Sequence, residues 1–359
     1  MAQPKYQLLQ QWLRDQINSG EYTANQQIPT ELELAEQFGY SRQTISGLEQ
    51  EGLLKRTPGR GTFVCRQNAG RVNRSESRTR RVGVLTTYLD DYIFPGIING
   101  IERVLSRHDY LFTLGLTHNK TLDEATALQK LLAAGVDGLI IEGTKTALPT
   151  PNEGILQSFR DAGIPMVFIN GCYDGANDSY VLMDDVQSGE LLTQHLIDRG
   201  HTQIGGIFKS DDIQGVKRYE GVVKGMQKND EHIKDDCILW YTTEDVRYLF
   251  EGSMDEMILK RLADSTAVVC YNDEIAAKLI DVLRRAGRRV PDDLSVVGFD
   301  NSPFAGSQLY NLTTVTYPAA DIGETAANVL MRCLEDPEHR EHIKIKPNIV
   351  ERGSVRCLK

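Results

Sequence analysis

The sequence predicts an α/β protein in two parts: a small unit of three helices and a two-stranded hairpin, then a large body of parallel sheets covered by helices. Turn residues divide residues 1–64 into short helix-sized segments that end in a hairpin pattern. From residue 81 onward, apolar β-branched runs alternate with amphipathic segments. Such alternation is typical of parallel sheets with helices on both faces. A length of 359 residues also indicates more than one domain.

The composition is that of a soluble globular protein, with 40% hydrophobic and 25% charged residues. No apolar run reaches the roughly 20 residues that span a bilayer. The first residues lack the charged-then-apolar layout of a secretory signal. The six cysteines form no Cys-x-x-Cys pair, which favours reduced thiols. We therefore expect a cytoplasmic protein without a membrane partner.

Charge is distributed unevenly along the chain. A net charge of −10 argues against a protein that is basic throughout to bind nucleic acid, yet residues 66–81 carry six arginines and one glutamate. A basic segment beside an acidic body is typical of a modular DNA-binding protein. We assign residues 66–80 as a linker between domains at 1–65 and 81–359. The linker is either a solvated tether or an additional contact to DNA phosphates.

In the first domain, apolar residues at helical spacing indicate helices over about 6–17, 30–38 and 41–51. Strands at 53–56 and 62–64 then form a hairpin around a glycine-rich turn. The helix ends are marked by residues that cap or break helices: Asn18-Ser19-Gly20, the capping box Thr30-x-x-Glu33, Gly39, Ser41 and Gly52.

Three helices and a two-stranded wing form a winged helix-turn-helix, whose third helix enters the major groove. At the start of that helix, Arg42 can bridge guanine O6 and N7, and Gln43 can pair with adenine. The hydroxyl of Thr44 and the helix N-terminus can bind phosphate. At the wing tip, Arg60 between two glycines brings a charge to the minor groove.

This domain resembles the DNA-binding domain of the GntR family. The resemblance covers nearly all of residues 4–64 and rests on Ile28-Pro29-Thr30-Glu31-x-Glu33-Leu34-Ala35, Phe38-Gly39-x-Ser41-Arg42-x-Thr44, Glu51-Gly52-Leu53-Leu54 and Gly59-x-Gly61-Thr62-Phe63-Val64. It implies DNA contacts from Lys5, Thr30, Arg42, Gln43, Thr44, Arg60 and Gly61.

The third helix departs from that family. After Ser-Arg-x-Thr-Ile the family usually continues with Arg-x-Ala-Ile, whereas here Ile45 leads through Ser46 and Gly47 directly to Leu48. About four residues, or one turn, are missing, and with them an arginine that often touches DNA. Either this helix is short or the sequence omits residues.

The strands of the large body are expected at 82–85, 111–116, 138–141, 165–169, 204–208, 238–240, 267–270 and 295–299, with helices such as 95–105, 125–132, 189–197 and 274–285. Ligands of parallel sheets bind beyond the strand C-termini. Those positions carry aromatic, carboxylate, amide and guanidinium groups, which suit the faces and hydroxyls of a sugar.

Residues 81–359 resemble the effector-binding domain of the LacI/GalR family. The motifs include Pro95-x-Ile97-x-x-Gly100-Ile101-Glu102, Val136-Asp137-Gly138-Leu139-Ile140, Arg218-x-x-Gly221, Asn272-Asp273-x-x-Ala276 and Ser295-Val296-Val297-Gly298-Phe299-Asp300. The resemblance implies a homodimer and a periplasmic-binding-protein-like fold of two lobes, about 81–184 with 317–344 and about 185–314 with 345–359. It implies effector contacts at Tyr92, Phe94, Glu142, Asn170, Arg218, Asn272 and Asp300.

A GntR-type domain joined to a LacI-type domain resembles the arabinose-responsive repressors of Gram-positive bacteria. That resemblance implies a repressor that binds operator DNA and is released by a monosaccharide, with L-arabinose the first candidate. Arg218 is the only cation among the seven predicted contacts, against the carboxylates of Glu142 and Asp300. We therefore expect a neutral sugar and not a sugar phosphate, with its ring stacked on Phe94 or Tyr92.

The alternative is a sugar-binding protein or enzyme with no role in DNA regulation. The sequence has neither a G-x-G-x-x-G fingerprint nor a P-loop, and no catalytic triad motif accompanies its Ser, His and Cys residues. His339-x-x-His342 has metal-like spacing, but we interpret residues 337–347 as a solvated charged turn. We expect no catalytic residues, no metal and no cofactor, and a transport receptor is disfavoured because it requires export.

Overall fold

The computed structural model describes residues 12–13, 16, 22, 26–29, 54–57, 61–64, 78–89, 91–173 and 177–359. The chain divides into two compact units, Met1–Arg78 and Thr79–Lys359. The predicted helices at 30–38 and 41–51 lie outside the described residues, as does most of the predicted linker. No helix in the described ranges is both long and apolar enough to cross a bilayer.

In the first unit the predicted hairpin is confirmed. Strands β1 (Leu54–Thr57) and β2 (Gly61–Val64) pair antiparallel, with Leu54 opposite Val64 and Thr57 opposite Gly61. Residues 26–28 run beside β2, and the Ile28 amide donates to the Thr62 carbonyl. The described residues 12, 13 and 16 are helical, within the first predicted helix, and Leu13 is fully buried.

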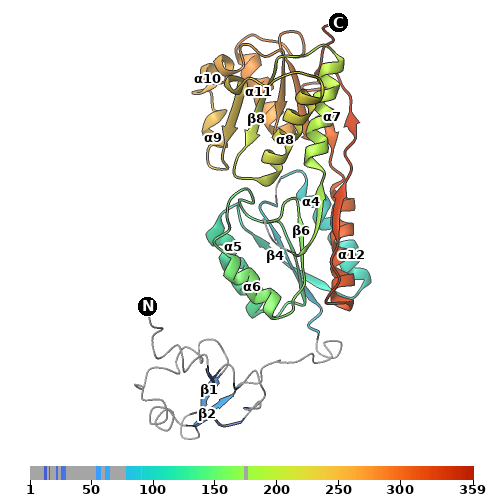
Figure 1. The fold of residues 1–359 in the computed structure, drawn as a ribbon. Helices are drawn as coiled ribbons and strands as arrows, with labels where there is room; N and C mark the ends of the chain where they lie inside the picture. The colour runs from blue at the N-terminus through green and yellow to red at the C-terminus, as the bar shows by residue number, and fades with distance from the viewer. Residues whose placement is uncertain are drawn as a thin grey trace. The chain divides into compact units, whose positions relative to one another are not determined.

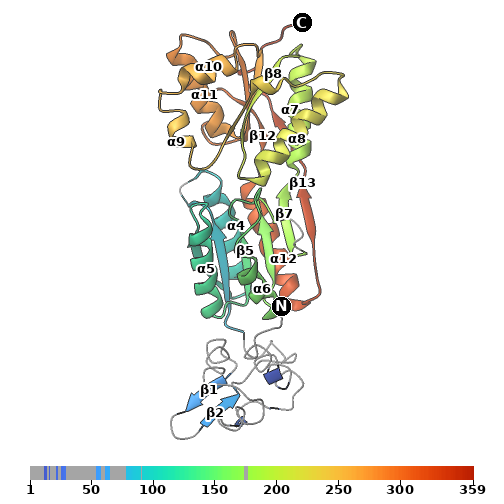
Figure 2. The same cartoon turned by 60° about the vertical axis from the view of Figure 1, so that its left-hand side comes forward.

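The second unit contains two six-stranded sheets, each in its own lobe (Figures 1 and 2). The first sheet is parallel throughout, in the order β13-β7-β6-β5-β3-β4. Its strands are β3 (Arg81–Thr86), β4 (Leu111–Leu116), β5 (Gly138–Ile141), β6 (Met166–Ile169), β7 (Ser179–Met183) and β13 (His342–Ile345). Helices α4 (Phe94–Arg107) and α12 (Ala319–Glu335) cover one face, and α5 (Thr121–Ala133) and α6 (Glu153–Asp161) cover the other (Figure 1).

The second sheet has the order β14-β12-β11-β10-β8-β9 and is parallel except for β14. Its strands are β8 (Ile204–Lys209), β9 (Ile238–Tyr241), β10 (Ala267–Cys270), β11 (Ser295–Asp300), β12 (Thr313–Thr316) and β14 (Ile349–Val350). Its helices are α7 (Asp185–Asp198), α8 (Ile213–Lys228), α9 (Val246–Leu249), α10 (Asp255–Arg261) and α11 (Asp273–Arg285). Separate apolar cores lie between each sheet and the helices on its two faces.

The chain crosses between the lobes three times: from β7 to α7, from β12 to α12, and from β13 to β14. These crossings place the C-terminal ends of the parallel strands of both sheets toward the junction of the lobes (Figure 2). The connections after the strands of one lobe therefore face those of the other.

Each strand and each helix predicted from the large body's pattern is present, within a few residues at the ends. The interpretation of residues 337–347 as a solvated turn is wrong for their second half. Residues His342–Ile345 form edge strand β13, which pairs parallel with β7, and Tyr180 stacks on His342 at 4.5 Å. The alternation of exposed and half-buried residues is that of an edge strand covered on one face.

Candidate functional site

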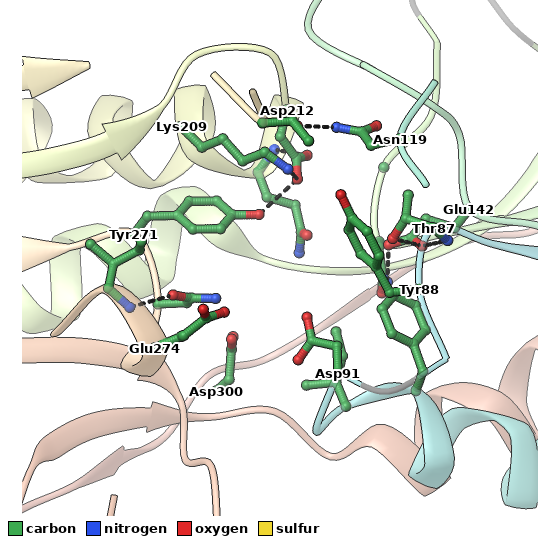
Figure 3. A pocket seen from close by; sticks show the side chains of 18 of the residues that line it. Thr87, Tyr88, Asp91, Asn119, Glu142, Lys209, Asp212, Tyr271, Glu274 and Asp300 are labelled. Atoms are coloured by element: carbon green, nitrogen blue, oxygen red, sulfur yellow. Dashed lines mark hydrogen bonds and ion pairs between the residues drawn. The ribbon is translucent and has the colours of Figure 1, made fainter. Parts of the chain in front are cut away.

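A cavity of about 640 Å³ lies between the two lobes, beyond the C-terminal ends of their strands. All seven residues predicted as effector contacts line it. From the first lobe come Tyr92 and Phe94 at the start of α4, Glu142 after β5 and Asn170 after β6; from the second come Arg218 on α8, Asn272 before α11 and Asp300 at the end of β11. Figure 3 shows Glu142 and Asp300 on opposite sides of this space.

Glu142 is held in place by hydrogen bonds to both of its carboxylate oxygens. Oε2 accepts from the backbone amide and the hydroxyl of Thr87, each at 2.7 Å, and Oε1 accepts from Asn170 Nδ2 at 2.8 Å. Tyr317 donates in turn to Asn170 Oδ1. Burial raises the pKa of Glu142 to about 7 although these hydrogen bonds oppose the shift. Because a carboxylate has about four acceptor positions, roughly one remains for a ligand hydroxyl.

Arg218 is 3% exposed, and each of its three guanidinium nitrogens donates a hydrogen bond. Nε donates to Asp185 Oδ1 at 2.9 Å, Nη2 to Asp300 Oδ1 at 3.2 Å and Nη1 to the Tyr271 carbonyl at 2.6 Å. The guanidinium also lies over the Phe299 ring at 4.6 Å and the Tyr271 ring at 5.1 Å. Two buried carboxylates therefore compensate the one buried guanidinium.

Close packing of α7 on α8 brings Asp185 within reach of Arg218. At Gly221 an added Cβ would lie 2.1 Å from the Val186 carbonyl oxygen, and at Gly189 it would lie 2.2 Å from the Arg218 carbonyl oxygen. Only glycine allows the two backbones to approach this closely. The motif Arg218-x-x-Gly221 thus combines a site residue with the glycine that positions its helix.

The predicted aromatic and amide contacts differ in their surroundings. Tyr92 donates to Asp300 Oδ2 at 2.6 Å, and its ring packs edge-on against Phe304. Phe94 is 2% exposed and belongs to the core of the first lobe, so little of its ring is open to a ligand. Asn272 caps α11, because its side-chain oxygen accepts from the Ile275 amide at 3.0 Å.

The cavity has further polar residues that the sequence analysis did not select. Apart from Glu274, which lies in the first turn of α11, they end strands or lie in the connections that follow strands: Thr87, Tyr88, Asp91, Asn119, Lys209, Asp212, Tyr241, Tyr271 and Tyr317. Inspecting the ends of β8 and β9 by the same rule would have found Lys209, Asp212 and Tyr241.

Lys209 lines the cavity as a second cation, in addition to Arg218 among the predicted contacts. Its Nζ lies 3.7 Å from Asp212 Oδ2, so this charge also faces a carboxylate. Asp91 has a buried oxygen, Oδ1, without a hydrogen-bond partner. Burial, together with Asp300 and Glu274, raises the pKa of Asp91 to about 6. The cavity therefore presents more carboxylates than cations.

Of the seven predicted DNA contacts, Gly61 alone lies among the described residues. Gly61 begins β2 with a φ of +109°, a backbone conformation that favours glycine, and the end of the Gln27 side chain packs against it. Lys5, Thr30, Arg42, Gln43, Thr44 and Arg60 lie outside the described residues, and so does the short segment from Ile45 to Leu48.

The described ranges contain no group of three or more His, Cys, Asp or Glu residues arranged to hold a metal ion. His339 instead contacts the carboxylate of Glu341.

Comparison with known proteins identifies both parts of the chain. Residues 5–64 match the bacterial regulatory proteins of the gntR family, and residues 193–355 match the periplasmic binding protein-like domain. The solved structure of a LacI family transcriptional regulator from Enterococcus faecium with bound ribose superposes with a TM-score of 0.64 at 25% identity, covering 78% of this chain and 100% of that one.

Two curated relatives match over the full length. The arabinose metabolism transcriptional repressor of Geobacillus stearothermophilus is 38% identical and covers 98% of both chains. That of Halalkalibacterium halodurans is 36% identical, covering 98% of this chain and 96% of the relative. These relatives are transcriptional repressors, and the chain is accordingly a regulator and not an enzyme. The chain belongs to the family of arabinose metabolism transcriptional repressors, in which a gntR-type DNA-binding domain is joined to a LacI-type sensor domain.

Proposed function

We propose that this protein represses sugar-utilisation genes by binding operator DNA as a homodimer in the cytoplasm, and that L-arabinose bound between the lobes releases it. The observation that carries the proposal is the cavity at the strand ends, with carboxylates, amides and aromatic rings contributed by both lobes. A ligand that contacts both lobes stabilises the arrangement in which they meet. The names of the two full-length relatives support arabinose as the sugar.

The charges at the cavity favour a neutral ligand. Arg218 is compensated by Asp185 and Asp300, and Lys209 faces Asp212. Asp91 and Glu142 also line the space and form no ion pair with a described residue, whereas Glu274 pairs with Lys278 at 3.3 Å. A phosphate would meet carboxylates where it requires donors, whereas sugar hydroxyls donate to carboxylates.

The effector contacts proposed are Tyr92, Glu142, Asn170, Arg218, Asn272 and Asp300, with Phe94 contributing mainly to the wall of the cavity. The DNA contacts proposed are Lys5, Thr30, Arg42, Gln43, Thr44, Arg60 and Gly61. A homodimer places two such domains on the half-sites of a two-fold operator. Exchange of Arg42 for Ala is expected to weaken specific binding by about 1–3 kcal/mol.

A thermal-shift screen tests the identity of the ligand. Pentoses, hexoses and their phosphates are each added to the full chain, and a specific ligand raises stability by RT ln(1 + [L]/Kd). L-Arabinose is expected to give the largest shift and sugar phosphates smaller ones. A phosphorylated sugar that stabilises more than every free sugar would overturn the neutral-ligand proposal.

A second measurement separates a repressor from a sugar-binding protein without a role at DNA. Operator fragments and random duplexes are compared at several salt concentrations, because nonspecific phosphate contacts weaken steeply with salt. The repressor is expected to keep its preference for the operator as salt rises. Equal affinity for both duplexes would favour the alternative.

A further inference from the structure

A cluster of charged and amide groups joins the two lobes beside the cavity. Lys145, in the connection after β5, extends from the first lobe toward the second. Its Nζ lies 3.1 Å from Asp211 Oδ2 and 2.8 Å from Glu244 Oε1. Asp211 follows β8 and Glu244 follows β9, and none of these three residues lines the cavity. The ion pairs therefore connect the lobes without taking part in the wall around a ligand.

Asn119 holds both sides of this cluster. Its Oδ1 accepts from the Lys145 amide at 2.8 Å, and its Nδ2 donates to Thr243 Oγ1 of the other lobe at 2.5 Å. The Thr243 amide donates to Asp211 Oδ2 at 3.1 Å, which closes the network. Figure 3 shows Asn119 bonded across the space between the lobes.

Lys145 and Asn119 both have a left-handed backbone conformation. The φ angles are +48° and +52°, in the left-handed region that side chains disfavour. Strain of this kind persists where surrounding interactions fix it, and it is common at ligand clamps. The amide of Lys145, bonded to Asn119, is one such interaction.

Opening the cleft would separate Lys145 from two carboxylates and would therefore cost free energy. Lys145 and Asp211 are largely buried, with side chains 20% and 3% exposed, and Asp211 Oδ1 has no hydrogen-bond partner. Moving the lobes apart takes Lys145 away from Asp211 and Glu244 together. Because charge pairs shielded from solvent are worth more than exposed ones, this cluster favours contact between the lobes.

We propose that Lys145, Asp211 and Glu244 form a closure latch, which sets the sugar concentration at which the repressor responds without contacting the sugar. The proposal rests on the proposed function of the cavity as a sugar site. A latch changes the fraction of molecules competent to close, and the apparent Kd of every ligand is inversely proportional to that fraction. It therefore alters affinity for all sugars by one factor and leaves their ranking unchanged.

The test compares Lys145→Met with Lys217→Met in the full chain. Lys217 pairs with Glu220 at 2.8 Å on the surface of α8, within one lobe, and so provides a matched control. Calorimetry measures the Kd of L-arabinose and of a second, weaker sugar. Lys145→Met is expected to weaken both by the same factor of about 3- to 10-fold, and Lys217→Met to change neither. Unchanged affinity in Lys145→Met, or a loss for one sugar alone, would overturn the latch.

Two further measurements keep the test decisive. Glu244→Gln alters a side chain that is 60% exposed, and it replaces Lys145→Met in the test if that variant fails to fold. Its affinity for both sugars is expected to fall by one common factor that is smaller than the factor for Lys145→Met. Small-angle scattering without sugar compares the radius of gyration of folded variants, which should increase in Lys145→Met relative to wild type and Lys217→Met. If wild type binds no sugar, the proposed function fails, and scattering alone decides the latch: an unchanged radius rejects it.

Discussion

Tyr92 of the first lobe donates a hydrogen bond of 2.6 Å to Asp300 of the second. Asp300 also accepts from Arg218, which is anchored by Asp185 on the neighbouring helix. The start of α4 is thereby linked to α7 and α8 through two residues of the proposed sugar site. Movement of one lobe relative to the other must break or remake this bond. A ligand that changes the contacts of Tyr92 or Asp300 therefore also changes the contact between the lobes.

Tyr92→Phe should weaken sugar binding while leaving the fold intact. The variant keeps the ring and its packing on Phe304 but removes the bond to Asp300. A hydrogen bond to a charged group contributes about 1.5–3 kcal/mol, which predicts a 10- to 150-fold rise in Kd. Calorimetry measures it, with Tyr248→Phe, an exposed tyrosine outside the cavity, as control. Equal Kd values for Tyr92→Phe and wild type would show that the bond does not support closure.

Arg218→Met should destabilise the second unit strongly. The exchange leaves Asp185 and Asp300 buried without their shared cation, and breaking a buried ion pair costs about 3–5 kcal/mol. Denaturant unfolding of this unit, monitored by its fluorescence, measures the decrease in the free energy of unfolding. Arg284→Met removes a surface pair with Asp281 and should change stability by less than about 1 kcal/mol. Similar losses in both variants would contradict the role assigned to Arg218.

Sugar affinity should fall as the pH is lowered from 8 to 6. The pKa of Glu142 is about 7 and that of Asp91 about 6, both raised mainly by burial, and Asp212 and Asp300 add negative charge nearby. The ionised carboxylates accept hydroxyl hydrogen bonds more strongly, so binding favours proton release, and protonation at low pH opposes it. Calorimetry in buffers of different ionisation enthalpy measures the released protons. Affinity independent of pH would exclude both groups as ligand acceptors.

Asp137→Ala should reduce communication with the DNA-binding domain. Asp137 accepts from the amides of Thr79 and Arg80 at 3.1 and 2.8 Å, and thus fixes the chain where it enters the first lobe. Without this carboxylate, the amides of Thr79 and Arg80 lose their acceptor while the side-chain bonds to the Gly135 and His108 carbonyls remain, so the end of the linker is held less firmly. The sugar Kd should stay within about twofold while the effect of sugar on operator affinity shrinks. Asp161→Ala, on the surface of the same lobe, is the control. If sugar changes operator affinity as much in Asp137→Ala as in wild type, Asp137 does not link the linker to the lobe.

The alternating pattern allowed the sequence to predict eight of the strands and several of the helices, because apolar β-branched runs are typical of strands covered on both faces. Strands β7, β12, β13 and β14 were not predicted. β12 reads Thr-Thr-Val-Thr and β13 His-Ile-Lys-Ile, so neither forms an apolar run. Their pairing is decided by neighbours distant in the sequence, which local patterns do not report.

The site was predictable to the extent that its residues follow strands. Glu142, Asn170 and Asp300 were found in this way, whereas the latch residues Lys145 and Asp211 were not. Both residues also follow strands, but their role arises only when the two lobes bring Lys145 opposite Asp211. The capping role of Asn272 likewise depends on the geometry of the helix it precedes.

We propose that sugar binding between the lobes releases operator DNA. The most direct measurement is the affinity of the full chain for its operator with and without saturating L-arabinose, at one fixed salt concentration. Coupling free energies of about 1–3 kcal/mol predict that sugar weakens operator binding 5- to 150-fold, and that operator DNA weakens sugar binding by the same factor. Operator affinity that does not change with saturating sugar, in a protein that binds the sugar, would contradict the account.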